Sequence, residues 1–400
     1  MPLAPVEVTH AAGPAPGPSV LLVDPVLFTA PYDAALSRGL KANGVAVHWA
    51  TRALRPQEEP DLEAGQVSPV FYRMSDGPRR GGNGALRKML KGFEHMMGLG
   101  TVQKLARNRV ADLVHFQWSV LPSIDLRAIA RIRAERPVVL TVHDLVPFNG
   151  KDVNQLQRRG FDAVLRAVDH IIVHTDGART TLAGRGVDHG AISVIPHGLL
   201  PLKSAGSAAE RTDRRWRVIL FGRLQAYKGL DVLVEAAGRL DPQLRAGLHI
   251  IIAGEAMIPL DEIRRRITAL GLQNTITLDD RRFSESAMAT LLGSADAFVF
   301  PYSAIEASGV LHLVAGLEKW IIASDLGVFR DMIGHDGRCG ALTSPGDAAA
   351  LAQALAQSIG RIPAGRLDDG VPGWDEIGRR TRVVYEKVLT PRAVQHRVAA

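Results

Sequence analysis

Trp216-Arg-Val-Ile-Leu-Phe221 is a short apolar run, and it continues as Gly222-Arg-Leu-Gln-Ala-Tyr-Lys-Gly-Leu-Asp231, a glycine-bounded loop that leads into a helical pattern. The run predicts a strand that is buried on both faces. Gly222 lets the backbone approach a ligand at the end of that strand. Arg223 supplies a fork of donors and Lys228 a point charge, and together they can clamp a diphosphate. The alternative is a solvated turn with two surface cations, which the strand–loop–helix context disfavours.

The same alternation of apolar runs and helical patterns extends along almost the whole chain. The runs occupy residues 19–24, 45–49, 113–116, 138–142, 170–174, 216–221, 248–253, 275–278, 297–300 and 320–323. We expect about six strands before residue 200 and five after residue 215. Alternation with helices predicts parallel sheets with right-handed crossovers, so the fold class is α/β with two doubly wound, Rossmann-like domains. Ligands of such sheets bind beyond the carboxyl ends of the strands.

Changes in composition mark the expected domain boundaries. Residues 1–18 are rich in Ala, Pro and Gly and predict a disordered tail, because they lack the basic head and apolar run of a secretory signal. Residues 201–214 are small, polar and aperiodic, which predicts a linker. We therefore expect an N-terminal domain over 19–200 and a C-terminal domain over 215–375.

Composition and charge narrow the class of protein. Of the 400 residues 46% are hydrophobic and 22% are charged, which excludes a mostly disordered chain. The formal net charge of +7 favours an anionic partner: a nucleotide, a nucleic acid or a membrane surface. The single cysteine, Cys339, excludes an intrachain disulfide and a cysteine-based zinc site. No window approaches 18 uncharged apolar residues, so we expect no transmembrane helix and a cytoplasmic location, with the inner membrane face as one setting.

A second candidate site follows the apolar run 297–300. Ser308 and Gly309 look like the start of a helix that continues through Leu311, and the free N–H groups there form an anion site. Glu306, one turn earlier, can hold sugar hydroxyls. The alternative is an ordinary N-cap with an acidic residue that favours the helix dipole. Taken alone, these residues favour that alternative.

Several histidines follow predicted strands. His143 ends the run 138–142, His115 and His174 lie at or near the ends of other strands, and His197 comes just before the linker. With 13 histidines in the chain, most are expected to be surface or core groups. A histidine at the carboxyl end of a strand that faces a cleft is the better candidate for chemistry. We rank His143 first.

Four motifs taken together resemble a known family. They are Phe221-Gly-Arg…Tyr-Lys-Gly229, Val194-Ile-Pro-His-Gly198, Ala307-Ser-Gly-Val-Leu311 and Ile321-Ile-Ala-Ser-Asp-Leu-Gly327. Their order and spacing are similar to those of the GT-B glycosyltransferases of the large retaining family 4 (glycosyl transferases group 1), over roughly residues 19–390. The stretch after Gly373 looks like the family's closing helix, which we place at about 376–392 and expect to pack back on the N-terminal domain.

The resemblance implies that the C-terminal domain binds a nucleotide-diphosphate sugar, a GDP- or UDP-hexose. The residues that it places around this donor are Gly222, Arg223, Lys228, Glu306, Ser308, Gly309, Val310 and Leu311. Arg223 and Lys228 match the diphosphate pair, Glu306 matches the first glutamate of an E-x7-E motif, and His143 matches a histidine near the transferred sugar. We therefore expect these four residues to carry the catalysis.

The family's reaction implies the chemistry and the partners. Transfer retains the anomeric configuration and needs no metal or cofactor, and the leaving diphosphate takes the acceptor's proton, so we expect no protein nucleophile. A saccharide or a lipid-linked saccharide is the expected acceptor, in bacterial exopolysaccharide or glycolipid synthesis.

The sequence departs from the family pattern in three places. The second glutamate of the motif, which usually holds the ribose, would fall at Val314, and Glu318 lies four residues later. Glu318 and Trp320 stand where Gly and Pro are usual. The loop 25–31 lacks the usual glycine pair that contacts acceptor and diphosphate. A catalytically weakened nucleotide-sugar-binding protein is therefore an alternative.

Three other function classes fit less well. A GT-B-like epimerase would need a catalytic carboxylate with a histidine, and no matching set is found. A phosphorylase would need a pyridoxal-binding lysine near the C-terminus, and Lys387 has no supporting motif. Nucleic-acid binding is suggested by charge alone, but the basic stretch has few interleaved aromatic residues and no recognised module, so we expect no nucleic-acid partner.

Residues 79–109 form a basic stretch with eight cationic residues and one acid, Glu94. Its apolar residues fall at roughly helical spacing: Leu86, Met89, Leu90, Phe93, Met96 and Met97. A basic amphipathic helix suits an anionic membrane surface. The candidate membrane contacts are Arg87, Lys88, Lys91 and Phe93. The alternative is an ordinary helix that covers the sheet, with its charged face in water and its apolar residues buried.

Overall fold

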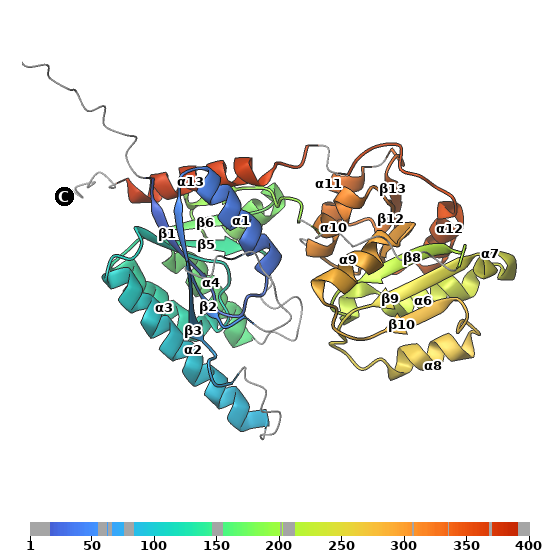
Figure 1. The fold of residues 1–400 in the computed structure, drawn as a ribbon, viewed down its shortest axis with the longest axis horizontal. Helices are drawn as coiled ribbons and strands as arrows, with labels where there is room; N and C mark the ends of the chain where they lie inside the picture. The colour runs from blue at the N-terminus through green and yellow to red at the C-terminus, as the bar shows by residue number, and fades with distance from the viewer. Residues whose placement is uncertain are drawn as a thin grey trace, which may run out of the picture.

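The chain folds into two α/β units, each built on an all-parallel sheet (Figure 1). The computed structural model describes residues 17–54, 62, 66–75, 84–145, 155–200, 202, 213–305, 308–334, 336–367 and 370–390. Of the predicted tail, only residues 17 and 18 belong to this set, and of the predicted linker only 202, 213 and 214. The remainder of both segments lies outside the described residues.

The first sheet has seven strands in the order β3-β2-β1-β4-β5-β6-β7. Its strands are β1 (Ser19–Asp24), β2 (Ala46–Arg52), β3 (Val67–Phe71), β4 (Leu113–Phe116), β5 (Val138–Val142), β6 (His170–Val173) and β7 (Ile192–Val194). Its helices are α1 (Ala30–Ala42), α2 (Gly84–Arg107), α3 (Pro122–Arg133), α4 (Gln155–Ala167) and α5 (Asp176–Gly184). The strand order reverses between β1 and β4, which marks the edge where such sheets bind ligands.

The second sheet has six strands in the order β10-β9-β8-β11-β12-β13 and reverses between β8 and β11. Its strands are β8 (Trp216–Phe221), β9 (Leu248–Ala253), β10 (Ile276–Asp279), β11 (Ala297–Phe300), β12 (Trp320–Ser324) and β13 (Gly340–Thr343). Its helices are α6 (Leu230–Arg239), α7 (Pro242–Ala246), α8 (Asp261–Ala269), α9 (Glu285–Gly293), α10 (Gly309–Val314), α11 (Gly327–Ile333) and α12 (Ala348–Ser358). The predicted α/β class with two doubly wound parallel sheets is confirmed.

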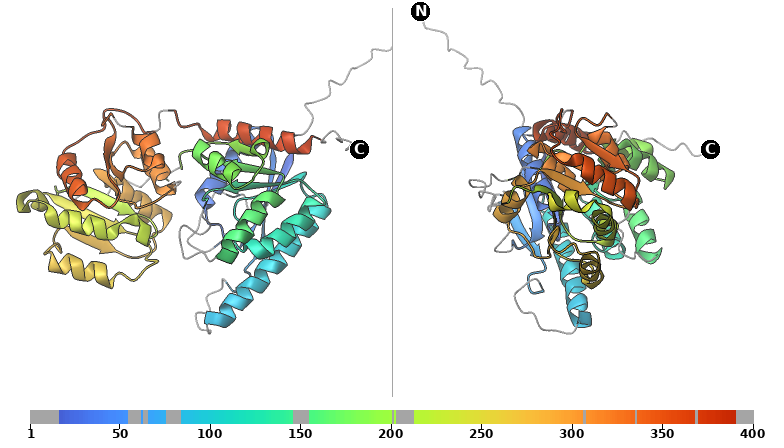
Figure 2. Two further views of the ribbon diagram at one scale, coloured as in Figure 1. Left: turned by 180° about the vertical axis from the view of Figure 1, so that it is seen from behind. Right: turned by 90° about the vertical axis from the view of Figure 1, so that its right-hand side faces the viewer.

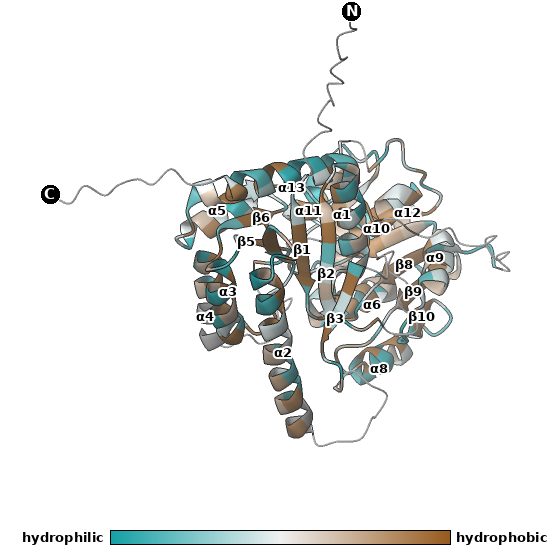
Figure 3. Ribbon diagram, turned by 60° about the vertical axis from the view of Figure 1, so that its left-hand side comes forward, coloured by the Kyte–Doolittle hydropathy of each residue, from teal (hydrophilic) through white to brown (hydrophobic). Residues whose placement is uncertain are grey.

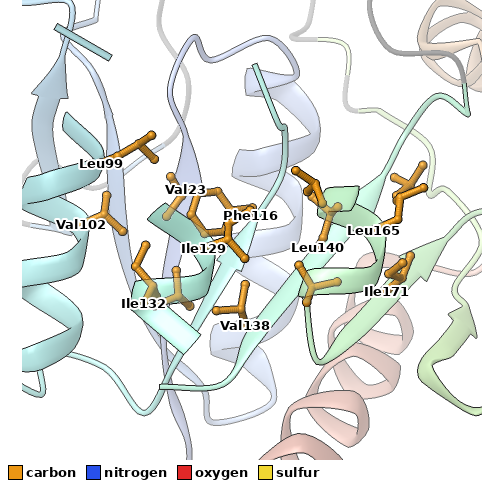
Figure 4. Packing of buried hydrophobic residues seen from close by; sticks show 14 of the residues in the cluster. Val23, Leu99, Val102, Phe116, Ile129, Ile132, Val138, Leu140, Leu165 and Ile171 are labelled. Atoms are coloured by element: carbon orange, nitrogen blue, oxygen red, sulfur yellow. The ribbon is translucent and has the colours of Figure 1, made fainter. Parts of the chain in front are cut away.

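The strands are buried on both faces, as their continuous apolar sequences predict. In β1, Leu21 and Val23 pack into a cluster with helices α2 to α4, whereas Val20 and Leu22 pack on the opposite face with α1. Figure 4 shows part of the first cluster, in which Phe116 lies between Val23 and Ile129. Brown, hydrophobic residues concentrate in the strands in Figure 3.

Three strands, β3, β7 and β13, have no counterpart among the apolar runs that the sequence shows. β3 contains Pro69 and is an edge strand, where a missing backbone donor is tolerated. β7 is also an edge strand and has three residues. β13 begins with Gly340, whose missing side chain lets it lie against the carbonyl group of Ile321. Each is too short or too atypical to form an apolar run.

The last helix, α13 (Trp374–Leu389), returns to the first unit and lies beside α1, as Figures 1 and 2 show. The two helices cross at Gly39 and Gly378, where a side-chain carbon on either residue would collide with the backbone of the other helix. Further along, the Tyr385 hydroxyl lies 2.8 Å from His115 Nδ1 under the sheet. The helix begins two residues before the predicted start and ends three before the predicted end.

Candidate active site

A cleft of about 910 Å³ lies where the carboxyl ends of the two sheets face each other. The first unit lines it with Phe28, Thr29, Pro31, Ala34, Arg38, Trp118, His143, Asp144, His197 and Leu200. The second unit lines it with Phe221, Arg223, Gln225, Tyr227, Lys228, Arg282, Glu285, Met288, Tyr302, Ile305, Ser308, Gly309, Val310 and Leu313. This is the position where doubly wound sheets bind ligands.

The loop after β8 places two cations on the cleft wall. Gly222 has a φ of 110°, and a side-chain carbon there would lie 3.0 Å from both Lys228 Nζ and a methyl group of Val310. Glycine is thus required both for the backbone conformation and for the approach of the ammonium group. Arg223 and Lys228 both line the cleft from this loop.

Lys228 is buried and held by two oxygens. Its ammonium group donates to the Phe221 carbonyl at 3.0 Å and to the Tyr302 hydroxyl at 2.6 Å. Burial lowers the pKa of Lys228 to about 7, because removal from water disfavours the charged form. An anion in the cleft would favour that charged form, so the geometry is suited to a diphosphate.

Arg223 reaches across the cleft to the first unit. Its guanidinium lies 4.2 Å from the centre of the Phe28 ring, a cation–π contact between the loops after β8 and β1. Phe28 in turn packs edge-on against Trp118, with 4.8 Å between ring centres. The Arg223 guanidinium is therefore held between the two units, where the loop after β8 meets the loop after β1.

The loop after β1 is shaped by a buried carboxylate in place of a glycine pair. Asp24 accepts hydrogen bonds from the amides of Val26 at 3.0 Å and Phe28 at 2.8 Å. Burial and the neighbouring Asp24 raise the pKa of Asp33 well above its usual value, which favours the protonated form of Asp33. This pair fixes the loop that carries Phe28 and Thr29 into the cleft.

The start of α10 lies on the cleft, and Ser308 caps it. The Ser308 hydroxyl accepts from the Leu311 amide at 3.2 Å. Gly309 and Val310 line the cleft, whereas Leu311 is buried in the core of the second unit. The Leu311 amide is already hydrogen-bonded to Ser308. We therefore expect Gly309 and Val310, rather than Leu311, to contact the nucleotide sugar. Glu306, the predicted sugar ligand, lies outside the described residues.

Val314 and Glu318, the two residues at which the sequence departs from the E-x7-E pattern, both lie away from the cleft. Val314 is fully buried in the core of the second unit. Glu318 has a positive φ of 54°, is half-exposed and pairs with Arg366 at 2.5 Å. Glu318 is absent from the residues that line the cleft, so among the described residues it does not replace the second glutamate.

His143 follows β5 directly and lines the cleft. Its ring stacks on Trp118, with 4.9 Å between ring centres and 19° between the planes, and meets the Tyr32 ring edge-on at 4.8 Å. Burial lowers the pKa of His143 well below its usual value, and the neighbouring His174 adds to this. His143 is therefore a neutral ring held in one orientation.

His197, another of the predicted histidines, lies at the boundary between the two units. His197 also lines the cleft, and its ring centre lies 4.1 Å from that of His312 in α10, across the boundary between the units. The Leu200 amide donates to the His312 carbonyl at 3.1 Å, and Trp374 Nε1 donates to the Leu199 carbonyl at 2.6 Å. The two contacts of His312, with His197 and with Leu200, join the two units.

Several cleft residues carry no motif in the sequence. Tyr302 follows β11 after a proline and bonds to Lys228, and Trp118 follows β4 by two residues. The sequence indicates Tyr302 and Trp118 only by their positions directly after apolar runs. Arg282 precedes α9 and Glu285 begins it, and both face the cleft from the second unit.

Within the part of the chain that the structure describes, no group of three His, Cys, Asp or Glu side chains could hold a metal ion.

Two family profiles match the chain, one in each unit. The profile described as Glycosyltransferase Family 4 matches residues 34–199, and the profile described as Glycosyl transferases group 1 matches residues 215–360. The chain belongs to the family 4, group 1 glycosyltransferases. The resemblance expected from the motifs is confirmed, and the enzyme class is glycosyltransferase.

Two relatives of this glycosyltransferase have names that refer to inositol compounds. A D-inositol 3-phosphate glycosyltransferase of Geodermatophilus obscurus is 28% identical over 86% of this chain and 81% of its own length. A phosphatidyl-myo-inositol mannosyltransferase of Mycobacterium leprae is also 28% identical, over 70% of this chain and 74% of its own.

Solved structures show the same fold at low identity. Anabaena Alr3699/HepE in complex with UDP and glucose superposes with a TM-score of 0.69 at 19% identity, over 92% of this chain and all of that one. WaaG, a glycosyltransferase involved in lipopolysaccharide biosynthesis, superposes with a TM-score of 0.60 at 16% identity, over 92% of this chain and 98% of its own. The glycosyltransferase therefore has the predicted GT-B fold.

Proposed function

We propose that the cleft transfers a hexosyl group from a GDP- or UDP-hexose to a saccharide or lipid-linked saccharide, with retention of anomeric configuration. The role is bacterial exopolysaccharide or glycolipid synthesis. The observation that carries the proposal is the pair Arg223 and Lys228 at the carboxyl end of β8, where two cations can stabilise a departing diphosphate. His143 lies on the opposite wall, where the transferred sugar would be held between the units.

Turnover of labelled donor onto a lipid extract tests this proposal. A thermal-shift screen with UDP-, GDP- and ADP-sugars comes first, since a ligand at 100 times its Kd adds about 2.7 kcal/mol of apparent stability. NMR of the product then reports the anomeric configuration. Donor binding without any turnover would instead favour the alternative, a catalytically weakened nucleotide-sugar-binding protein.

Donor affinity is expected to fall as the pH rises above 7. The pKa of Lys228 is lowered by burial to about 7, so its ammonium is charged below that pH and increasingly neutral above it. A bound diphosphate favours the charged form, so the donor Kd should rise by up to about tenfold per pH unit. Calorimetry between pH 6 and 9 measures this slope. The slope should vanish in Lys228→Arg, whose guanidinium stays charged; an unchanged slope there would assign the titration to another group.

Activity is expected to survive chelation by EDTA. The cations of the β8 loop supply the charge that a divalent ion supplies in other diphosphate sites. The measurement is donor turnover in EDTA and after addition of manganese or magnesium. Full loss in EDTA with recovery on metal addition would contradict this proposal.

We further propose that α2 contacts an anionic membrane surface. This helix projects away from the first unit, and its free end shows brown in Figure 3 (see also Figure 1). Its later part is anchored to the first unit: Glu94 accepts hydrogen bonds from the amides of Met74 and Ser75, and Gly98 lies against the Phe71 ring. No described helix is both long and apolar enough to span a membrane.

Five of the six apolar residues singled out in this stretch are exposed, namely Leu86, Met89, Phe93, Met96 and Met97, which disfavours a helix that buries them against the sheet. The exposed fractions of Phe93, Met96 and Met97 are 53%, 48% and 60%. Lys88 is exposed and Lys91 half-buried beside them, and Arg87 belongs to the same helix. An apolar face flanked by cations suits a surface of anionic lipid.

Charge reversal on α2 is expected to abolish binding to liposomes that contain phosphatidylglycerol. Each cation near such a surface contributes about 1 kcal/mol, so Arg87, Lys88 and Lys91 replaced by Glu lose most of the attraction. Co-sedimentation measures this, with neutral liposomes for comparison. The matched control reverses Arg379, Arg380 and Lys387 on α13, at the opposite end of the first unit (Figure 1). If both triple variants sediment alike, α2 is not the docking surface.

A further inference from the structure

The hydrogen bonds of His174 determine where its own proton lies. His174 Nδ1 is 3.0 Å from the carbonyl oxygen of Ile195, and a carbonyl oxygen only accepts. His174 Nδ1 must therefore carry a proton. Burial lowers the pKa of His174 to about 4, so the ring is neutral at pH 7 and its Nε2 carries a lone pair.

The proton shared by the two rings then belongs to His143. His174 Nε2 lies 3.1 Å from His143 Nδ1, and since the former is an acceptor the latter must donate. His143 is also neutral, so its Nε2 is left with a lone pair. The Gln117 side-chain oxygen lies 3.3 Å from this Nε2 and its amide nitrogen lies 3.4 Å from His115 Nε2; exchanging the two amide atoms by a half-turn brings the NH2 group to His143 Nε2.

A turned-over His143 ring would lose its hydrogen bond to His174. Trp118 stacks on one face, the Tyr32 ring meets it edge-on, and His174 occupies Nδ1. His174 occupies Nδ1, so Nε2 is the ring nitrogen that can meet a substrate, and a substrate hydroxyl there would replace the 3.3 Å contact with Gln117.

We infer that His174 is a positioning residue that holds His143 in its Nδ1–H tautomer and so makes His143 Nε2 a hydrogen-bond acceptor. The inference rests on the proposed function in one respect, that His143 contacts a sugar. An acceptor at this point selects a substrate O–H or N–H group and disfavours a carboxylate or phosphate oxygen, which can only accept. The group of the sugar that meets this nitrogen is therefore a hydroxyl rather than a carboxylate oxygen.

The tautomer can be read directly in the full-length protein without substrate. Long-range ¹H–¹⁵N spectra of ¹⁵N-histidine-labelled protein distinguish protonated from bare ring nitrogens, and the His143 signals are those lost in His143→Gln. We expect Nδ1–H in the wild type and Nε2–H, the form preferred by free histidine, in His174→Leu. His174→Gln, whose side-chain oxygen can accept the same proton, should keep Nδ1–H.

Turnover is expected to follow the tautomer. His174→Leu should lower kcat/KM by roughly tenfold, the effect of one misdirected hydrogen bond, and His174→Gln should recover most of it. The control is His170→Leu: His170 is a buried histidine at the start of β6, the strand that His174 follows, and it is bonded to Ser193 at 2.9 Å, so its loss should change neither the His143 tautomer nor the rate.

Two results would overturn the inference: a wild-type His143 protonated at Nε2, or a His174→Leu variant in which His143 stays protonated at Nδ1. Normal turnover by His143→Gln would contradict the proposed role of His143 instead. The two failures are distinguishable because the tautomer is measured in the absence of donor.

Discussion

Alanine at position 228 is expected to lower donor turnover by roughly 100- to 1000-fold, the usual effect of losing one group that stabilises developing charge. The Lys228 ammonium lies on the cleft wall at the end of β8, against Gly222, where the terminal phosphate of a departing diphosphate would gain an additional negative charge. Its loss also leaves the Phe221 carbonyl and the Tyr302 hydroxyl without this donor.

Arg223→Ala should show a loss of similar size by a separate route. Its guanidinium is exposed to the cleft and stacked on Phe28, so its removal leaves the core intact. Both variants should therefore be compared in steady-state turnover and in thermal denaturation. A loss of rate with an unchanged melting temperature in Arg223→Ala separates chemistry from folding.

The matched control for both variants is Arg281→Ala. Arg281 lies in the same unit, pairs with Asp279 at 3.1 Å and stacks on Phe283, but does not line the cleft. Its removal should leave turnover within about twofold, since exposed ion pairs contribute little. Wild-type rates in Lys228→Ala and Arg223→Ala would refute the assignment of the β8 loop.

The fold was predictable because buried parallel strands leave continuous Val and Ile runs in the sequence. β5 and β9 are of this kind, and both follow the predicted ranges. An edge strand such as β3 leaves no such run. The backbone N–H groups on its outer side have no neighbouring strand to bond, so Pro69 is tolerated there. The α13 crossing could be expected only from the family resemblance, because Gly39 and Gly378 are far apart in sequence and each alone is uninformative.

The site was predictable only in part, for a similar reason. A glycine and two cations in one loop form a local pattern, so Arg223 and Lys228 could be singled out. That Lys228 is buried against Tyr302, or that Phe28 stacks on Arg223, depends on strands that are distant in sequence. The same holds for His143 and His174, which adjacent strands β5 and β6 bring together.

The second large effect concerns stability: Gly378→Ala is expected to lower the free energy of unfolding by about 1–3 kcal/mol. A methyl group at this position would collide with the carbonyl group of Gly39 and approach the amide nitrogen of Leu40. Backbone atoms cannot move aside as a flexible side chain can, so α1 and α13 must separate. The bond between Tyr385 and His115 lies further along the same helix and would be strained with it.

Gly100→Ala is the matched control, because it makes the same change in a helix with open space. Gly100 lies inside α2, and a methyl group there would have no atom within 4 Å. Alanine should therefore stabilise this helix by about 0.5–1 kcal/mol, since glycine loses more backbone freedom on folding. Urea denaturation should thus shift in opposite directions for the two variants. A shift in the same direction, or no loss in Gly378→Ala, would show that the two helices do not depend on their close contact.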